Sequence, residues 1–125
     1  MKIFTVNPSS WGDKVNFVDH ENTVVGYDMG QSCCEHAGWY VSEVKRNDTK
    51  DEETITEGLE EYRFDREFFE HEESRELDYG GMIRFRLTAN GKPDLFLQIF
   101  NSHNGYYAHG FTVEHSGTVV RSDSL

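Results

Sequence analysis

The sequence predicts a mainly β protein, an antiparallel sandwich or open barrel of roughly eight strands. Three observations support this prediction. Apolar and polar residues alternate in short runs, most clearly over residues 83–88. Tight-turn dipeptides, Asn-Gly twice and Ser-Gly once, divide the last third of the chain. The length of 125 residues suits a single β domain, residues 1–125, with one hydrophobic core.

The first third of the chain is expected to supply four strands. Four short runs rich in Val, Ile and aromatic residues predict them, at residues 2–6, 15–18, 23–27 and 39–42. The second and third runs form a hairpin across residues 19–22. A turn is expected over residues 7–10, where Asn, Pro and Ser gather, and a loop over residues 30–38.

The middle of the chain has weaker signals. Residues 45–51 are polar and predict a mobile loop. Ile55, Leu59 and Tyr62 fall at helical spacing, which predicts one short helix within residues 51–62, although a glycine in the middle opposes it. Residues 62–72 fit a strand or a short helix equally well.

The last third predicts a four-stranded antiparallel meander. Its strands are residues 83–88, 95–101, 106–114 and 118–122, joined by Asn90-Gly91, Asn104-Gly105 and Ser116-Gly117. With two-residue turns throughout, one apolar row crosses all four strands, through Phe85, Phe96, Val113 and Val120. We expect this row to face the core. The other face carries Leu95, Leu97 and Ile99 and forms either a second packed layer or a groove.

The charge is concentrated in one acidic, insert-like segment. The net charge is −11, and residues 48–78 hold 14 of the 23 acidic residues but only 4 of the 12 basic ones. Such a protein repels phosphate, so we expect no direct binding of nucleic acid and no binding to an anionic membrane. A solvated face is the favoured interpretation of this segment, and an acidic mimic of nucleic acid is the alternative.

The location follows from what the sequence lacks. It has no apolar run of membrane-spanning length and no signal-peptide pattern at its start. A cytoplasmic setting with reduced thiols is therefore expected.

Both cysteines lie in one cluster of reactive residues, Cys33, Cys34, Glu35 and His36. Together with His103, these thiols and imidazoles are the candidate ligands of a zinc ion. Adjacent cysteines point apart, however, and zinc sites space them by two to four residues. The meander also places His109 on the core face, opposite Phe100, with His103 on the other face. We therefore expect packing thiols, a core histidine at position 109 and no cofactor.

The same cluster allows a cysteine nucleophile. Cys34 and His36 share one face of an extended segment, so a thiolate–imidazole pair can form. Only His36 supplies positive charge, and Glu35 opposes a lowered thiol pKa. The redox spacing Cys-x-x-Cys is absent. A thiol enzyme is thus an alternative rather than the favoured interpretation.

The tight turn after the second meander strand is a candidate binding surface. Aromatic and polar residues gather there, namely His103, Asn104, Tyr106, Tyr107 and His109. Turn chemistry alone explains the Asn-Gly pair equally well. The partner would be an unknown protein or a small molecule. The edge strand at residues 118–122 permits either a monomer or an edge-paired dimer.

Three segments together resemble a family of small uncharacterised bacterial and phage proteins. They are Ser-Cys-Cys-Glu-His-Ala-Gly-Trp (residues 32–39), Gly-Lys-Pro-Asp-Leu (91–95) and His-Asn-Gly-Tyr-Tyr-Ala-His-Gly-Phe (103–111). The likeness covers most of the chain outside the acidic segment. It implies no activity and no catalytic residue. The function expected from the sequence is therefore a non-enzymatic binding module, with a zinc- or thiol-dependent enzyme and the acidic mimic as alternatives.

Overall fold

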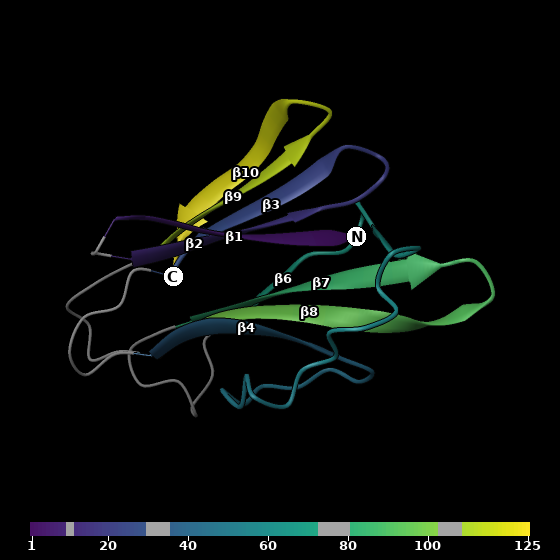
Figure 1. Cartoon of the computed structure of the whole chain (residues 1–125), viewed down its shortest axis with the longest axis horizontal. Helices are drawn as coiled ribbons and strands as arrows, with labels where there is room; N and C mark the ends of the chain where they lie inside the picture. The colour runs from purple at the N-terminus through teal and green to yellow at the C-terminus, as the bar shows by residue number, and fades with distance from the viewer. Residues whose placement is uncertain (10–11, 30–35, 73–80, 103–108) are drawn as a thin grey trace.

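Two antiparallel β sheets form the protein (Figure 1). The computed structural model describes residues 1–9, 12–29, 36–72, 81–102 and 109–125. These residues form ten strands and no helix, so the predicted β class is confirmed with ten strands in place of about eight. Within them, no helix is long and apolar enough to cross a membrane.

Each sheet contains five strands. The upper sheet in Figure 1 has the order β1-β2-β3-β9-β10, with the bounds Lys2–Ser9, Gly12–Val18, Thr23–Asp28, Gly110–His115 and Thr118–Ser124. The lower sheet has the order β4-β8-β7-β5, and β6 also pairs with β7. Their bounds are His36–Ser42 (β4), Arg63–Phe64 (β5), Glu70–Glu72 (β6), Gly81–Ala89 (β7) and Lys92–Ser102 (β8). The expected edge strand near residues 118–122 is thus confirmed as β10.

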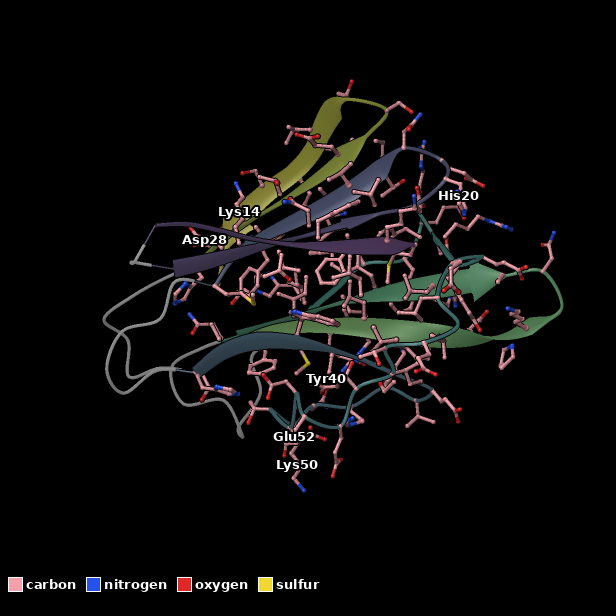
Figure 2. All side chains as sticks on the ribbon, in the orientation of Figure 1. Lys14, His20, Asp28, Tyr40, Lys50 and Glu52 are labelled. Atoms are coloured by element: carbon pink, nitrogen blue, oxygen red, sulfur yellow. The ribbon has the colours of Figure 1, made fainter. Side chains whose placement is uncertain are left out.

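The main core lies between the sheets, where side chains fill the space between the two layers (Figure 2). Residues with at most 2% exposure come from both layers and include Phe17, Tyr27, Ile83, Leu87, Leu97, Ile99 and Phe111. A second, smaller cluster of Tyr40, Met82 and Phe100 lies apart from the main core. Figure 2 shows Tyr40 on the side of the lower sheet that faces away from the upper sheet. The lower sheet is therefore covered on both faces.

The predicted meander is divided between the sheets. Its two hairpins, β7–β8 and β9–β10, form as expected, but β8 pairs with β4 and β7, whereas β9 pairs with β3 and β10. Strand β8 carries apolar residues on both faces and therefore needs covering layers on both sides. Placing β9 in the other sheet lets the two inner faces bury each other, which a single flat meander cannot do. The Asn104-Gly105 turn lies outside the described residues.

The predicted register is wrong by one residue in both hairpins. Beside each turn the pairing is as expected, but the register then shifts between Leu87 and Ala89, and between Val119 and Arg121. Phe85 consequently pairs with Leu97, and Val113 pairs with Arg121. Because side chains alternate along a strand, each one-residue shift exchanges the two faces of the strand beyond it. Leu95, Leu97 and Ile99 therefore face the main core instead of forming a second layer.

The predicted helix within residues 51–62 does not form. Leu59 and Tyr62 are buried as the pattern indicates, but the backbone between them follows turns, with Gly58 at a φ of +74°. Long-range hydrogen bonds replace the helical ones: the Ile55 amide donates to the Val41 carbonyl, and the Met1 ammonium donates to the Leu59 and Tyr62 carbonyls. Burial was readable from the sequence, whereas the tertiary partners set the conformation.

Two further predictions about local structure are settled. The turn expected over residues 7–10 is corrected for its first part, because β1 continues to Ser9. The ambiguous residues 62–72 form no helix and contribute the two short strands β5 and β6 to the edge of the lower sheet.

Candidate functional site

Most of the site residues predicted from the sequence lie outside the described residues. These are Cys33, Cys34, Glu35, His103, Asn104, Tyr106 and Tyr107. The described part of the chain contains no group of three His, Cys, Asp or Glu side chains that could hold a metal ion. Because both cysteines fall outside that part, the zinc site and the thiol site stay predictions.

His36 begins β4 and lies half exposed at the edge of the lower sheet. Its Nε2 is 3.4 Å from Asp51 Oδ1, and its ring packs on Phe100 with 5.1 Å between centroids. The strand thus brings His36 to the acidic segment.

His109 is buried, as expected of a core histidine, but its predicted position is wrong. It does not lie opposite Phe100, because β8 and β9 belong to different sheets. Its backbone pairs with Leu125 instead, with the His109 amide donating to the Leu125 carbonyl and the Leu125 amide donating back. The division of the meander is the physical reason for this correction.

Arg84 is the centre of a buried polar network on the outer face of the lower sheet. Its side chain is 3% exposed. Nε donates to Gln98 Oε1 at 3.2 Å, one Nη donates to the Arg46 carbonyl at 2.7 Å, and the other lies 3.3 Å from Glu70 Oε1. Gln98, fully buried, donates to the Tyr40 carbonyl and to Ser42 Oγ. A buried guanidinium requires this many acceptors to offset its lost hydration.

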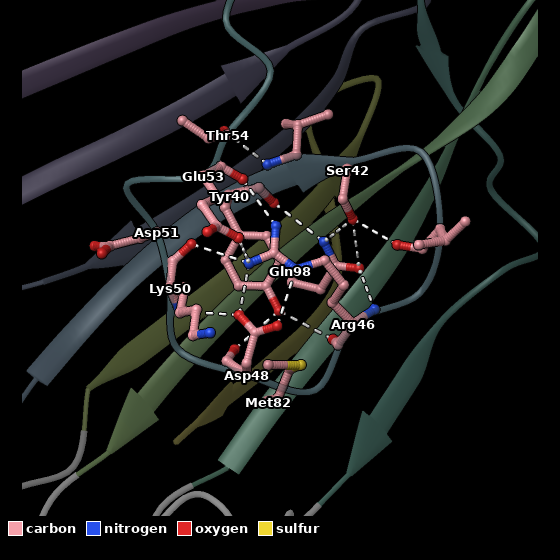
Figure 3. A network of polar contacts seen from close by, with 12 residues as sticks. Tyr40, Ser42, Arg46, Asp48, Lys50, Asp51, Glu53, Thr54, Met82 and Gln98 are labelled. Atoms are coloured by element: carbon pink, nitrogen blue, oxygen red, sulfur yellow. Dashed lines mark hydrogen bonds and ion pairs between the residues drawn. The ribbon is translucent and has the colours of Figure 1, made fainter.

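The same network holds the start of the acidic segment against the sheet (Figure 3). Arg46 donates through Nε to Asp48 at 2.9 Å and through Nη1 to the Glu53 carbonyl at 2.8 Å. The Tyr40 hydroxyl bonds the Arg46 and Asp48 carbonyls at 3.0 and 2.9 Å. These polar groups are used within the chain. The network is therefore a structural clamp that covers the outer face of the sheet.

Three carboxylates that accept hydrogen bonds from arginine or lysine make the fold sensitive to acid. They are Asp48, Asp65 and Glu70. Hydrogen bonds from Arg46 and Arg86 hold the pKa values of Asp48 and Asp65 below their ordinary value. Burial alone would raise the pKa of Glu70, but hydrogen bonds from Lys45 and Arg84 outweigh it and lower the pKa. As the pH falls, these carboxylates take up protons at a higher pH in the unfolded chain than in the folded one. The stability that they contribute is therefore fully present above about pH 5 and is lost as the pH falls through about 4 and below.

Thermal unfolding between neutral pH and pH about 2.5 tests this prediction. We expect Asp65→Asn to lower the midpoint at neutral pH and to flatten its fall in acid. Glu57→Gln, at an exposed position of the same acidic segment, is the matched control and should leave the profile unchanged. Equal profiles for wild type and Asp65→Asn would contradict the proposed contribution of the Asp65–Arg86 pair.

A cavity of about 240 Å³ opens between the two sheets at the β10 edge. Strands β3, β9 and β10 contribute one side, and β5, β7 and the segment 65–69 contribute the other. Its lining consists of apolar and charged side chains, namely Thr23, Phe64, Asp65, Arg66, Phe68, Phe69, Phe85, Val113, His115, Val120 and Arg121.

The cavity is amphipathic. Phe64, Phe85 and Val113 are at most 5% exposed and form an apolar floor. Phe69 packs on Phe85 with 5.6 Å between ring centroids, and the Arg121 guanidinium lies 3.8 Å above the Phe69 ring. The exposed members of the lining are Arg66, Val120 and Arg121, so two guanidinium groups lie at the mouth, whereas the floor is mainly apolar.

The mouth of the cavity is positively charged although the protein as a whole is acidic. Arg66 and Arg121 both line it, and neither pairs with a carboxylate among the described residues. The one lining carboxylate, Asp65, accepts hydrogen bonds from Arg86. Burial and the charge of Arg66 lower the pKa of His115. At neutral pH the mouth therefore carries two guanidinium groups that no carboxylate among the described residues pairs with.

Sequence reasoning missed this site. Arg66, Phe68 and Phe69 lie within residues 62–72, for which the sequence does not distinguish a strand from a helix. The aromatic residues between Phe64 and Phe69, unusual inside an acidic segment, are the one sequence feature that indicates a site here. Arg121 pairs with Val113 only because the β9–β10 register shifts after Val119. Only the sheet packing brings these side chains together.

Fold and site define an all-β sandwich protein with an amphipathic cavity between its sheets. The chain belongs to the family described as a domain of unknown function (DUF7448), whose family model matches residues 2–113. The expected membership of an uncharacterised family is thereby confirmed; a bacterial or phage origin stays a prediction. No curated protein and no solved structure matches the chain.

Proposed function

We propose that this protein is a non-enzymatic binding module that takes up a small ligand in the cavity between its sheets. The observation that carries the proposal is the amphipathic cavity itself, with a buried aromatic floor and a polar mouth. Ligand sites in proteins are concave, mostly apolar and furnished with a few polar groups that fix orientation. A cavity of roughly 150 Å³ already accepts a benzene ring.

The polar groups around the cavity support binding rather than catalysis. Thr23 Oγ1 accepts a hydrogen bond from Arg66 Nε at 3.0 Å, and Asp65 is bound by Arg86. A nucleophile and a general base must be within hydrogen-bonding reach of each other. No such pair lies among the described residues that line the cavity.

The alternatives from the sequence receive less support. The acidic mimic requires a free face of carboxylates, whereas Asp48, Glu61, Asp65 and Glu70 lie within 4 Å of Arg or Lys nitrogens. Among the described residues, the contacts of His36 are with Asp51 and Phe100, and neither favours the zinc- or thiol-dependent enzyme. We therefore carry the binding module forward as the proposed function.

Amide NMR spectra recorded during titration with indole, a neutral ring, test the proposal. We expect saturable shifts at Phe69, Val113 and His115, which line the cavity. Val120→Trp should abolish them, because this side chain lines the mouth and a larger one would fill it.

Val119→Trp is the matched control. Val119 and Val120 are adjacent on β10 and equally exposed, at 52% and 51%, but Val119 does not line the cavity. The Val119→Trp variant should therefore bind indole as the wild type does. Equal effects of the two variants, or the absence of saturable shifts in wild type with indole and with charged aromatic probes alike, would overturn the proposed function.

A further inference from the structure

The geometry points to small aromatic anions as the ligands of this cavity, with the ring on the phenylalanine floor and a carboxylate or phosphate head between Arg66 and Arg121. This inference rests on the proposed function and deepens it, because it assigns the ligand class.

The interior suits a flat apolar body. Phe85 meets both Phe64 and Phe69 edge-on, with 5.6 Å between centroids in each pair. Aromatic rings favour such edge-to-face arrangements, and a further ring can extend the cluster in the same way. Val113 completes this floor, so the apolar side chains of the lining can cover the faces of an aromatic ring.

The mouth suits an anionic head. The Arg121 guanidinium is fixed over the Phe69 ring at 3.8 Å, a stacking that leaves its N–H groups at the guanidinium edge able to donate. Arg66 uses Nε for Thr23 Oγ1 and one Nη for the Glu21 carbonyl, so its other Nη has no acceptor among the described residues. Two positioned guanidinium groups with free donors match the oxygens of a carboxylate or a phosphate.

His115 makes the site responsive to protons. It lies on β9 among groups from three sides: Arg66 and Asp65 from the 65–69 segment, Arg121 from β10 and Asp19 from the β2–β3 turn. Burial and the two arginines favour the neutral ring, and Asp19 opposes them. An anion in the mouth would offset the arginines and favour the protonated ring. Anion binding therefore takes up protons and strengthens as the pH falls.

Titrations of the full chain with four probes test the inference. Benzoate and phenyl phosphate carry ring and charge, benzamide carries the ring alone, and acetate carries the charge alone. We expect at least one of the two aromatic anions to bind about tenfold more tightly than benzamide, and acetate to bind more weakly than either. The tighter of the two identifies the head group.

Arg121→Gln should remove the preference for the anion and retain benzamide binding. Arg63→Gln is the matched control, because Arg63 lies on the neighbouring β5, pairs with Glu21 and does not line the cavity. Benzoate should also bind more tightly around pH 6 than around pH 8, and His115→Gln should remove this difference.

The failure of the inference is distinguishable from that of the proposed function. If benzamide binds in the cavity as tightly as both anions, or if the two arginine variants behave alike, the ligand class is wrong and the binding module stands. If neither indole nor any of the four probes shifts the cavity amides, both are wrong.

Discussion

Replacing Arg84 with methionine is expected to lower the free energy of unfolding by about 3 kcal/mol or more. Methionine keeps much of the length of the side chain but removes every donor. Gln98 Oε1 and the Arg46 carbonyl would each lose their charged donor in a buried region, and Glu70 would lose one of its two cations. Hydrogen bonds from charged donors contribute more to stability than those between neutral groups, so their loss is costly here. Chemical denaturation measures the change.

Arg63→Met is the control for the Arg84 experiment. Arg63 and Glu21 are 39% and 56% exposed, so this ion pair contributes about 1 kcal/mol or less. The double variant Arg84→Met with Glu70→Gln should recover part of the loss, because it also removes the carboxylate that Arg84 compensates. Equal stabilities of Arg84→Met and Arg63→Met would show that the buried network does not hold the fold.

Leu97→Ala is expected to cost about 3 kcal/mol, and Phe96→Ala markedly less, about 1 kcal/mol. Leu97 is completely buried in the main core, whereas Phe96 lies half buried on the outer face, with Phe68 at 6.0 Å between ring centroids. Deletion of a core side chain loses both its transfer free energy and the packing around the cavity that it leaves. Urea denaturation of the two variants measures the difference.

The order of these two effects distinguishes the observed register from the one that the turns alone predict. Under the predicted register Phe96 faces the core and Leu97 does not, so the larger side chain would also give the larger loss. A greater loss for Phe96→Ala would therefore contradict the one-residue shift in the β7–β8 pairing.

The arginine side chains of the two sheets fall into two groups with different surroundings. The clamp around Arg84 uses carboxylates of the acidic segment to cover the outer face of the lower sheet. The cavity at the β10 edge instead leaves two arginines without carboxylate partners among the described residues. Unlike the acidic surface, this edge can attract an anion at short range, where local charges outweigh the screened net charge.

Local sequence determined the β class, two hairpins of the last third and part of the buried positions. Alternation placed Ile83, Phe85 and Leu87 on one face of β7, as the structure has them. Tight-turn dipeptides located two of the β hairpins, because Gly91 and Gly117 supply the positive φ that such turns require. The positions of Leu59 and Tyr62 in the core were also readable, although their conformation was not.

Only the tertiary structure decided which strands are neighbours, which face of β8 is the core and where the cavity lies. A shift of one residue beyond Leu87 or Val119 exchanges faces, and nothing in the local pattern announces it. Pairing of β9 with β3 is decided by burial between two sheets, an energy that involves residues far apart in sequence. The cavity follows from both, because Phe69 and Arg121 meet only when the sheets pack.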